Sequence, residues 1–166
     1  MAPQNLFDRI SDITGKVIAW FTLAMVLVTT IIVVLRYVFD AGFIWMQESV
    51  TWMHAAVFMI GAAYTLMHEE HVRVDIFYRK MSDKRRAIVD LVGVIIFLLP
   101  LCLYLALMAY DFAATSWSIQ ETSREPGGLP YPAIPLMKSI VIVMPVALAL
   151  QGVSMMMRAI ATLRGE

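Results

Sequence analysis

Long apolar stretches separated by short polar segments dominate the pattern of this chain. Four runs of 19 or 20 residues contain no Asp, Glu, Lys or Arg: 17–35, 49–67, 91–110 and 139–157. The hydrocarbon core of a bilayer is about 30 Å thick, and a helix of about 20 residues crosses it. Because backbone groups in the hydrocarbon must be hydrogen-bonded within their own segment, each run predicts a transmembrane helix.

The residues that flank these runs extend the expected helices. With them, the helices cover residues 15–38, 46–68, 84–116 and 134–160. Apolar side chains at near-helical spacing in residues 3–14, with polar ones between them, predict a short amphipathic helix in the membrane interface before the first span. We therefore expect an all-α membrane protein with four transmembrane helices, forming a single domain over residues 1–166.

Basic residues set the expected orientation. Ten Lys and Arg residues lie in the N-terminal segment, the second loop and the C-terminus, whereas the other side holds only Arg36, Arg124 and Lys138. Loops rich in Lys and Arg stay in the cytoplasm. We expect a multi-pass protein of the bacterial inner membrane, with both termini in the cytoplasm and the third loop, about 111–138, in the periplasm.

Composition narrows the function classes. Hydrophobic residues make up 60% of the chain, against about 45–50% in soluble domains. The net charge is zero, which gives no indication of nucleic-acid binding, and Cys102 alone cannot form an internal disulfide or a metal cluster. No phosphate loop, nucleophile–base pair or metal-ligand spacing is evident. We expect no enzyme activity and no cofactor in this chain.

His54 is the only histidine within the four apolar runs, since His68 and His71 lie at the cytoplasmic edge. A bis-histidine haem site would need a second one at matching depth on another helix. This disfavours a haem-carrying membrane anchor, and we expect a packed, hydrogen-bonded imidazole instead.

Arg36 and Glu48 lie at the end of the first expected helix and the start of the second. The turn between them is short enough to bring the two side chains together, and a carboxylate is favoured near a helix N-terminus. An ion pair that fixes this hairpin is the preferred interpretation. A coupling-ion or proton site is the alternative.

Ordered motifs stand at the ends of the expected helices. They are Arg36-Tyr37 after the first, Trp45 and Glu48 at the second, His71-Val-Arg73-Val-Asp75 after it, and Glu121-Thr-Ser, Pro126-Gly-Gly128-Leu-Pro130 and Lys138 before the last. In this order they resemble the small membrane subunit of tripartite ATP-independent periplasmic (TRAP) transporters, the DctQ-like family. The resemblance spans about residues 15–160, and the pair Tyr131-Pro132 departs from it.

The resemblance implies two protein partners in addition to membrane lipids. These are a large membrane subunit, which binds substrate and sodium, and a periplasmic binding protein, which delivers an organic acid. The small subunit would act as a scaffold without a transport path or cofactor of its own. By this view Arg73 and Asp75 fix the cytoplasmic loop or its contact with the large subunit, and Arg124 and Lys138 help to dock the binding protein.

The alternative is a stand-alone exporter or channel built from several copies of this chain. That function needs a polar stripe along one helix, and none is evident from the sequence. The apolar runs also lack a carboxylate near their middles.

Overall fold

The computed structural model describes residues 6–68, 75–78 and 80–165. Four helical segments in it are long and apolar enough to cross a membrane, which confirms the predicted all-α fold with four spans. They are α1 (Leu6–Val38), α2 (Ile44–Met67), a third span built from α4 (Asp83–Gly93), η1 (Val94–Leu98) and α5 (Leu99–Ser118), and α6 (Ala133–Arg164). A single helical turn, α3 (Asp75–Tyr78), lies between α2 and α4.

The third span changes its hydrogen-bonding pattern near its middle. The segment η1 is a π-helix, and the N–H of Leu99 donates to the carbonyl of Val94, five residues back. Pro100 follows directly and has no N–H to donate. Single π-turns of this kind occur inside α-helices where the regular ladder is interrupted, so α4, η1 and α5 form one continuous rod.

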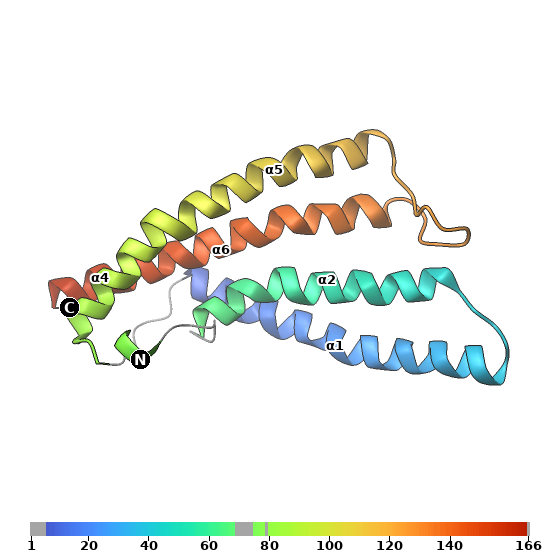
Figure 1. Cartoon of the computed structure of the whole chain (residues 1–166), viewed down its shortest axis with the longest axis horizontal. Coiled ribbons are helices and arrows are strands. Elements are labelled where there is room, and N and C mark those ends of the chain that lie inside the picture. Colours follow the sequence, from blue (N-terminus) through green and yellow to red (C-terminus); the bar gives the residue numbers. More distant parts are fainter. Residues whose placement is uncertain (1–5, 69–74, 79, 166) are drawn as a thin grey trace.

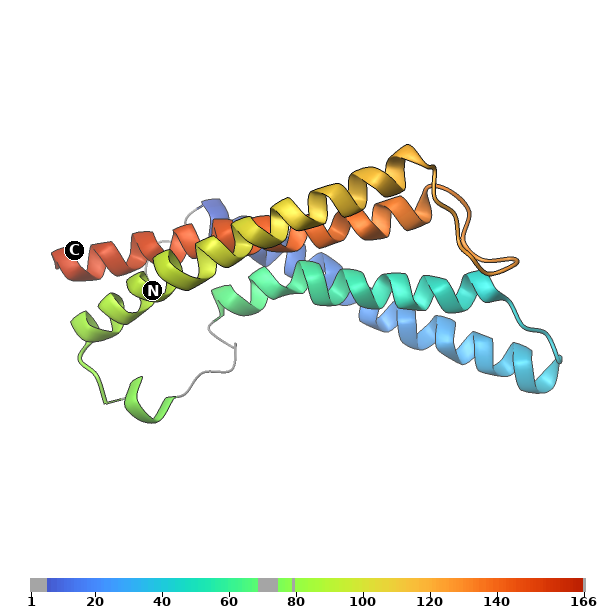
Figure 2. The ribbon, with the colours of Figure 1, turned by 45° about the horizontal axis from the view of Figure 1, so that its top comes forward.

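The four spans lie in an open row. In Figure 1, toward the α1–α2 connection, α2 and α6 occupy the middle, with α1 at one edge and α5 at the other. Figure 2 shows that α1 crosses α2, so that its beginning lies against α6, which it also contacts. The beginning of α1 and the end of α6 lie at one end of the row, which we call the termini end. The α1–α2 connection and the α5–α6 loop lie at the opposite end, which we call the loop end.

Few side chains are buried in this row. A small cluster of Ile18, Ala56 and Ile140 joins α1, α2 and α6. The accessible surface is 11226 Å², against about 8,300 Å² for a compact soluble protein of this mass. Large apolar side chains therefore remain exposed along every span, as expected of surfaces that face lipid or other membrane helices.

Close contacts fix α2 between its two neighbours. A Cβ on Gly15 of α1 would lie 2.2 Å from the ring of Tyr64, so only glycine permits this crossing. On the other side, the indole N–H of Trp52 donates to the carbonyl of Ala133 at 3.3 Å.

The N-terminal segment differs from the expectation in one respect. Residues from Leu6 onward are helical, but they continue into the first span as one helix instead of forming a separate one. Two of the polar side chains, Asp8 and Ser11, are buried against α6. Part of the polar face that was expected to contact water therefore packs against α6, because α6 supplies polar side chains as hydrogen-bond partners there.

Candidate functional site

A hydrogen-bonded carboxylate organises the loop end. Glu48, in the second turn of α2, accepts a hydrogen bond from the hydroxyl of Ser123 and another from the N–H of Leu129, the latter at 2.6 Å. Both donors belong to the α5–α6 loop. Glu48 therefore ties that loop to the start of α2.

The same loop is fixed at its base by a second carboxylate. Glu121 accepts from the ammonium of Lys138 at 2.5 Å and from the hydroxyl of Ser116 at 2.6 Å. The two charged side chains are only 16% and 18% exposed. The hydrogen bonds from Lys138 and Ser116 hold the pKa of Glu121 below its ordinary value. Lys138 also lies over the ring of Phe112, 4.3 Å from its centroid.

Backbone contacts complete the loop. The N–H of Trp45 donates to the carbonyl of Gly127 at 3.1 Å, so the first turn of α2 also holds the loop. A Cβ on Gly128 would lie 2.2 Å from the hydroxyl oxygen of Ser123 and 2.7 Å from a carboxylate oxygen of Glu48. Gly128 is thus the residue that lets the loop close on Glu48.

The expected ion pair between Arg36 and Glu48 is wrong. Among the described residues no ion pair joins them, and Glu48 faces Ser123 and Leu129 instead. Arg36 is exposed in the last turn of α1. The reason is the helix order, since α2 lies beside α6 and turns Glu48 toward the α5–α6 loop.

The remaining residues singled out at this end are exposed. Arg36, Tyr37, Trp45, Arg124 and Pro130 all lie on the surface. Tyr37 is 82% exposed, which suits the polar interface of a membrane. Arg124 is thus a charged side chain of the loop that a partner could reach, whereas Lys138 is engaged by Glu121.

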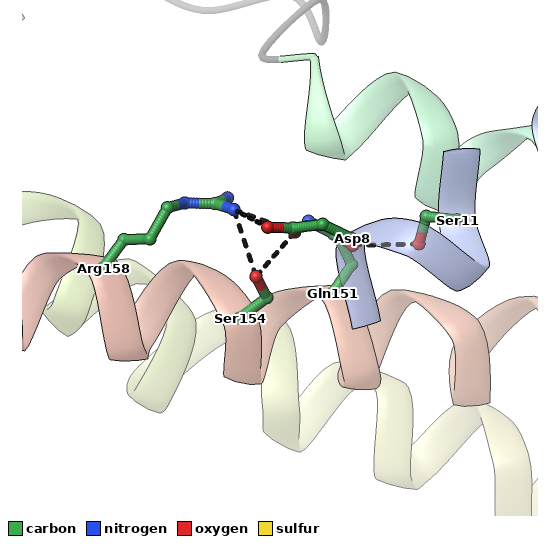
Figure 3. Close-up of polar contacts among 5 residues, drawn as sticks. All are labelled: Asp8, Ser11, Gln151, Ser154 and Arg158. Atoms are coloured by element: carbon green, nitrogen blue, oxygen red, sulfur yellow. Dashed lines mark hydrogen bonds and ion pairs between the residues drawn. The ribbon is translucent and has the colours of Figure 1, made fainter. Parts of the chain in front are cut away.

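A second polar cluster lies at the termini end (Figure 3). The carboxylate of Asp8 in α1 accepts from Gln151 at 2.9 Å, Ser154 at 2.7 Å and Arg158 at 2.8 Å, all three in α6. Ser11 donates to the side-chain oxygen of Gln151 at 2.9 Å. Gln151 and Ser154 are fully buried. Buried polar groups of this kind are tolerated because they are hydrogen-bonded.

Sequence reasoning did not find this cluster. The signal that could have found it is spacing, because Gln151, Ser154 and Arg158 recur at i, i+3 and i+7 on one face of the last helix. Asp8 and Ser11 are three residues apart and also share a face. The cluster locks the beginning of α1 onto α6.

His71 and Arg73 lie outside the described residues, and Asp75 is the first residue of α3. The described part of the chain does not provide the packing and the hydrogen bond that were expected for His54. Its ring is exposed on α2 and contacts the ring of Phe58 at 4.8 Å between centroids, and no hydrogen bond joins it to another described residue.

Within the part of the chain that the structure describes, no group of three or more His, Cys, Asp or Glu is placed to hold a metal ion. The two carboxylate clusters are closed by their own donors. Their hydrogen bonds hold the α5–α6 loop and the beginning of α1 in place, which is a structural role.

Comparison with known proteins gives two matches. The family described as the DctQ component of tripartite ATP-independent periplasmic transporters matches residues 25–164. The C4-dicarboxylate TRAP transporter small permease protein DctQ of Vibrio cholerae serotype O1 is 30% identical over 95 residues. That match covers 55% of this chain and 41% of the relative, so the aligned region spans less than half of the relative's length.

Proposed function

Because this chain belongs to the DctQ family of TRAP transporter components, we propose that it scaffolds a large sodium-coupled transport subunit in the inner membrane and helps to dock a periplasmic binding protein. Family membership makes it a multi-pass transport component and not an enzyme. The scaffold role, the partners and sodium coupling are the proposal. Its substrate would be an organic acid, the class to which the C4-dicarboxylates named for the Vibrio cholerae relative belong.

The observation that supports a scaffold is the open row of helices. In the described part of the chain α1 and α5 do not pack against each other, so the helices are not closed into a ring around a path for a charged solute. Transporters place substrate between helices at mid-membrane, with broken helices and polar groups around it. The polar clusters described above lie at the two ends of the row and are closed by internal hydrogen bonds. The path for the acid would then belong to the large subunit.

The orientation is part of the same proposal. Ten basic residues against three favour the termini end in the cytoplasm and the loop end in the periplasm. The exposed Arg124 loop would then face the binding protein. A reporter active only outside the cytoplasm should work when inserted at Arg124 and fail when fused after Glu166, and the reverse pattern would contradict this orientation.

Reconstitution tests the function. Vesicles that contain this chain and the large subunit should take up the acid when the binding protein and a sodium gradient are supplied. Vesicles with this chain alone should show no uptake. Uptake by this chain alone would favour the homo-oligomeric exporter, and full uptake by the large subunit without this chain would remove the scaffold role.

A further inference from the structure

One side of α2 carries four polar residues, a glycine and a phenylalanine, all of them exposed or partly exposed. Gln47, Thr51, His54, Phe58, Gly61 and Thr65 follow each other at alternating steps of four and three residues, and we call these six residues the α2 seam. Residues at this spacing share one face of a helix. The first four are exposed and the last two partly exposed, and Phe58 is 68% exposed.

The seam is the free side of α2. The α1 side of α2 is occupied through Tyr64, which packs on Gly15, and the α6 side through Trp52, which reaches Ala133. The seam lies on the side of α2 away from Trp52, and its Phe58, Gly61 and Thr65 line a groove that α2 shares with α1. Whatever covers them in the membrane is therefore lipid or another protein.

The free faces of other spans have a different chemistry. On α6 the exposed side chains at seven-residue spacing are Leu136, Val143, Leu150 and Met157. In the third span, Phe97 of η1 is an apolar side chain that is 70% exposed. Acyl chains solvate such surfaces well. Of the four spans, α2 is the least apolar, and its seam contributes much of that difference.

His54 makes lipid a poor cover for the seam. It lies ten residues from the start of α2, which is about 15 Å along the helix and close to its middle. The hydroxyls of Thr51 and Thr65 bond to their own helix backbone, at Gln47 and Gly61. The imidazole has no such partner among the described residues, and an ionisable group at this depth is costly unless it pairs.

Space beside the seam favours a helix as its partner. A groove of about 460 Å³ lies between α1 and α2, and its lining includes Ala19 and Thr22 of α1 and Phe58, Gly61 and Thr65 of the seam. A Cβ on Gly61 would meet nothing within 4 Å, so this fold does not itself require glycine there. Small residues at an open face let a second membrane helix approach closely.

We propose that the α2 seam is the surface on which a transmembrane helix of the large subunit packs, with a hydrogen-bonding side chain of that helix opposite His54. This inference rests on the proposed function, which supplies a membrane partner of a different sequence. It assigns that partner to α2 and leaves the outer faces of α6 and of the third span, which includes η1, to lipid.

Photo-crosslinking tests the assignment in the complex of this chain with the large subunit. A benzophenone amino acid at Phe58 should crosslink to the large subunit, and the same amino acid at Phe97 should not. The two sites are matched, since both are phenylalanines at 68% and 70% exposure. Crosslinking only to a second copy of this chain, only from position 97, or to no protein at all would overturn the inference.

Substitutions provide a second readout. His54→Leu should reduce the amount of large subunit that co-purifies with this chain by about three- to fifteenfold, the range for one interhelical hydrogen bond in a membrane. His54→Gln should restore most of it. Gly61→Leu should also reduce co-purification, whereas Gly93→Leu, at another open glycine, should not. Unchanged co-purification with both His54→Leu and Gly61→Leu would remove the seam from the interface.

These outcomes separate the inference from the proposed function. If the two unaltered subunits co-purify but the seam variants behave as controls, the seam assignment fails and the scaffold function stands. If the unaltered subunits do not associate, the proposed function fails and the seam assignment fails with it.

Discussion

The carboxylate of Glu48 accepts a hydrogen bond from the N–H of Leu129, 81 positions further along the chain, at 2.6 Å. This contact joins the start of α2 to the loop that precedes α6. Together with the hydroxyl of Ser123 it satisfies both carboxylate oxygens. The loop conformation thus depends on a residue of a different hairpin.

Replacing Glu48 by Ala should loosen this loop. The N–H of Leu129 and the hydroxyl of Ser123 would lose their acceptor, at a cost on the order of 1–3 kcal/mol in unfolding free energy. Limited proteolysis of the purified protein, followed by mass spectrometry, should show faster cleavage within residues 119–132. Glu125→Ala, at an exposed position of the same loop, is the control. Equal cleavage rates in the two variants would contradict the role of Glu48.

Gly128→Ala should disturb the same contact without removing any polar group. The added Cβ would lie 2.2 Å from the hydroxyl oxygen of Ser123, so the loop must shift. We expect thermal unfolding in detergent at a lower temperature than for the unaltered protein, by several degrees. Gly42→Ala is the matched control, because a Cβ there meets nothing within 4 Å. A Gly128→Ala protein as stable as Gly42→Ala would show that the loop closes differently.

Asp8→Asn should weaken the attachment of α1 to α6. The variant removes the negative charge that pairs with Arg158. It also replaces one carboxylate oxygen by an NH2 group, which cannot accept the hydrogen bonds that Ser154 and Arg158 donate. Because Arg158 is 31% exposed, we expect a loss on the order of 1–3 kcal/mol, less than for a fully buried pair. Chemical unfolding in mild detergent would measure it. Asp12→Asn, which breaks only an exposed pair with Lys16, should change stability by less than about 1 kcal/mol.

The pair of Glu121 and Lys138 predicts a loss of loop stability in acid. Lys138 and Ser116 lower the pKa of Glu121 in the folded protein, so their contribution is complete above the unfolded pKa. It is lost as pH falls through the lower, folded pKa. Tryptophan fluorescence of the unaltered protein between about pH 6 and about pH 3 should report this loss near Trp117, because the ordinary carboxyl pKa lies near 4.3. In Glu121→Gln this part of the pH dependence should disappear, while Glu125→Gln should keep it.

Arg124→Glu tests docking of the binding protein without disturbing the loop. Its side chain is exposed, whereas reversal of Lys138 would break the pair with Glu121 and unfold the base of the loop. In reconstituted vesicles the binding-protein concentration needed for half-maximal uptake should rise several-fold, and this rise should shrink at high salt because exposed charges are screened. Arg164→Glu, at the opposite end of the row, should leave it unchanged. An unchanged concentration for Arg124→Glu would exclude Arg124 from the docking surface.

Much of the loop end was predictable, but its contacts were not. Glu48, Glu121, Gly128 and Lys138 were all singled out from the sequence, and the structure brings them into one loop region. The expected partner of Glu48 was wrong because Arg36 is near in sequence, and proximity along the chain was the only distance information available. The donors from the α5–α6 loop become neighbours only through the pairing of α2 with α6.

The polar stripe on α2 was missed for a related reason. Gln47, Thr51, His54 and Thr65 are diluted among apolar residues when the run is read linearly. Their spacing places them on one face of a helix, but only the packing of α1 and α6 on α2 shows that this face stays exposed. The sequence of a membrane helix shows which residues are polar, but only the tertiary structure shows which of them are exposed.

The sequence by itself determined that this protein has four membrane helices and to which family it belongs. Those properties can be read from short segments of the chain. An apolar run predicts a span when it is long enough to cross the hydrocarbon core of a bilayer, and short motifs in a fixed order identify the family. Only the tertiary structure decided that the helices form an open row, that Asp8 is bound by α6, and that the α2 seam is free. These properties join residues as far as 150 positions apart, and packing, not periodicity along the chain, selects such pairs.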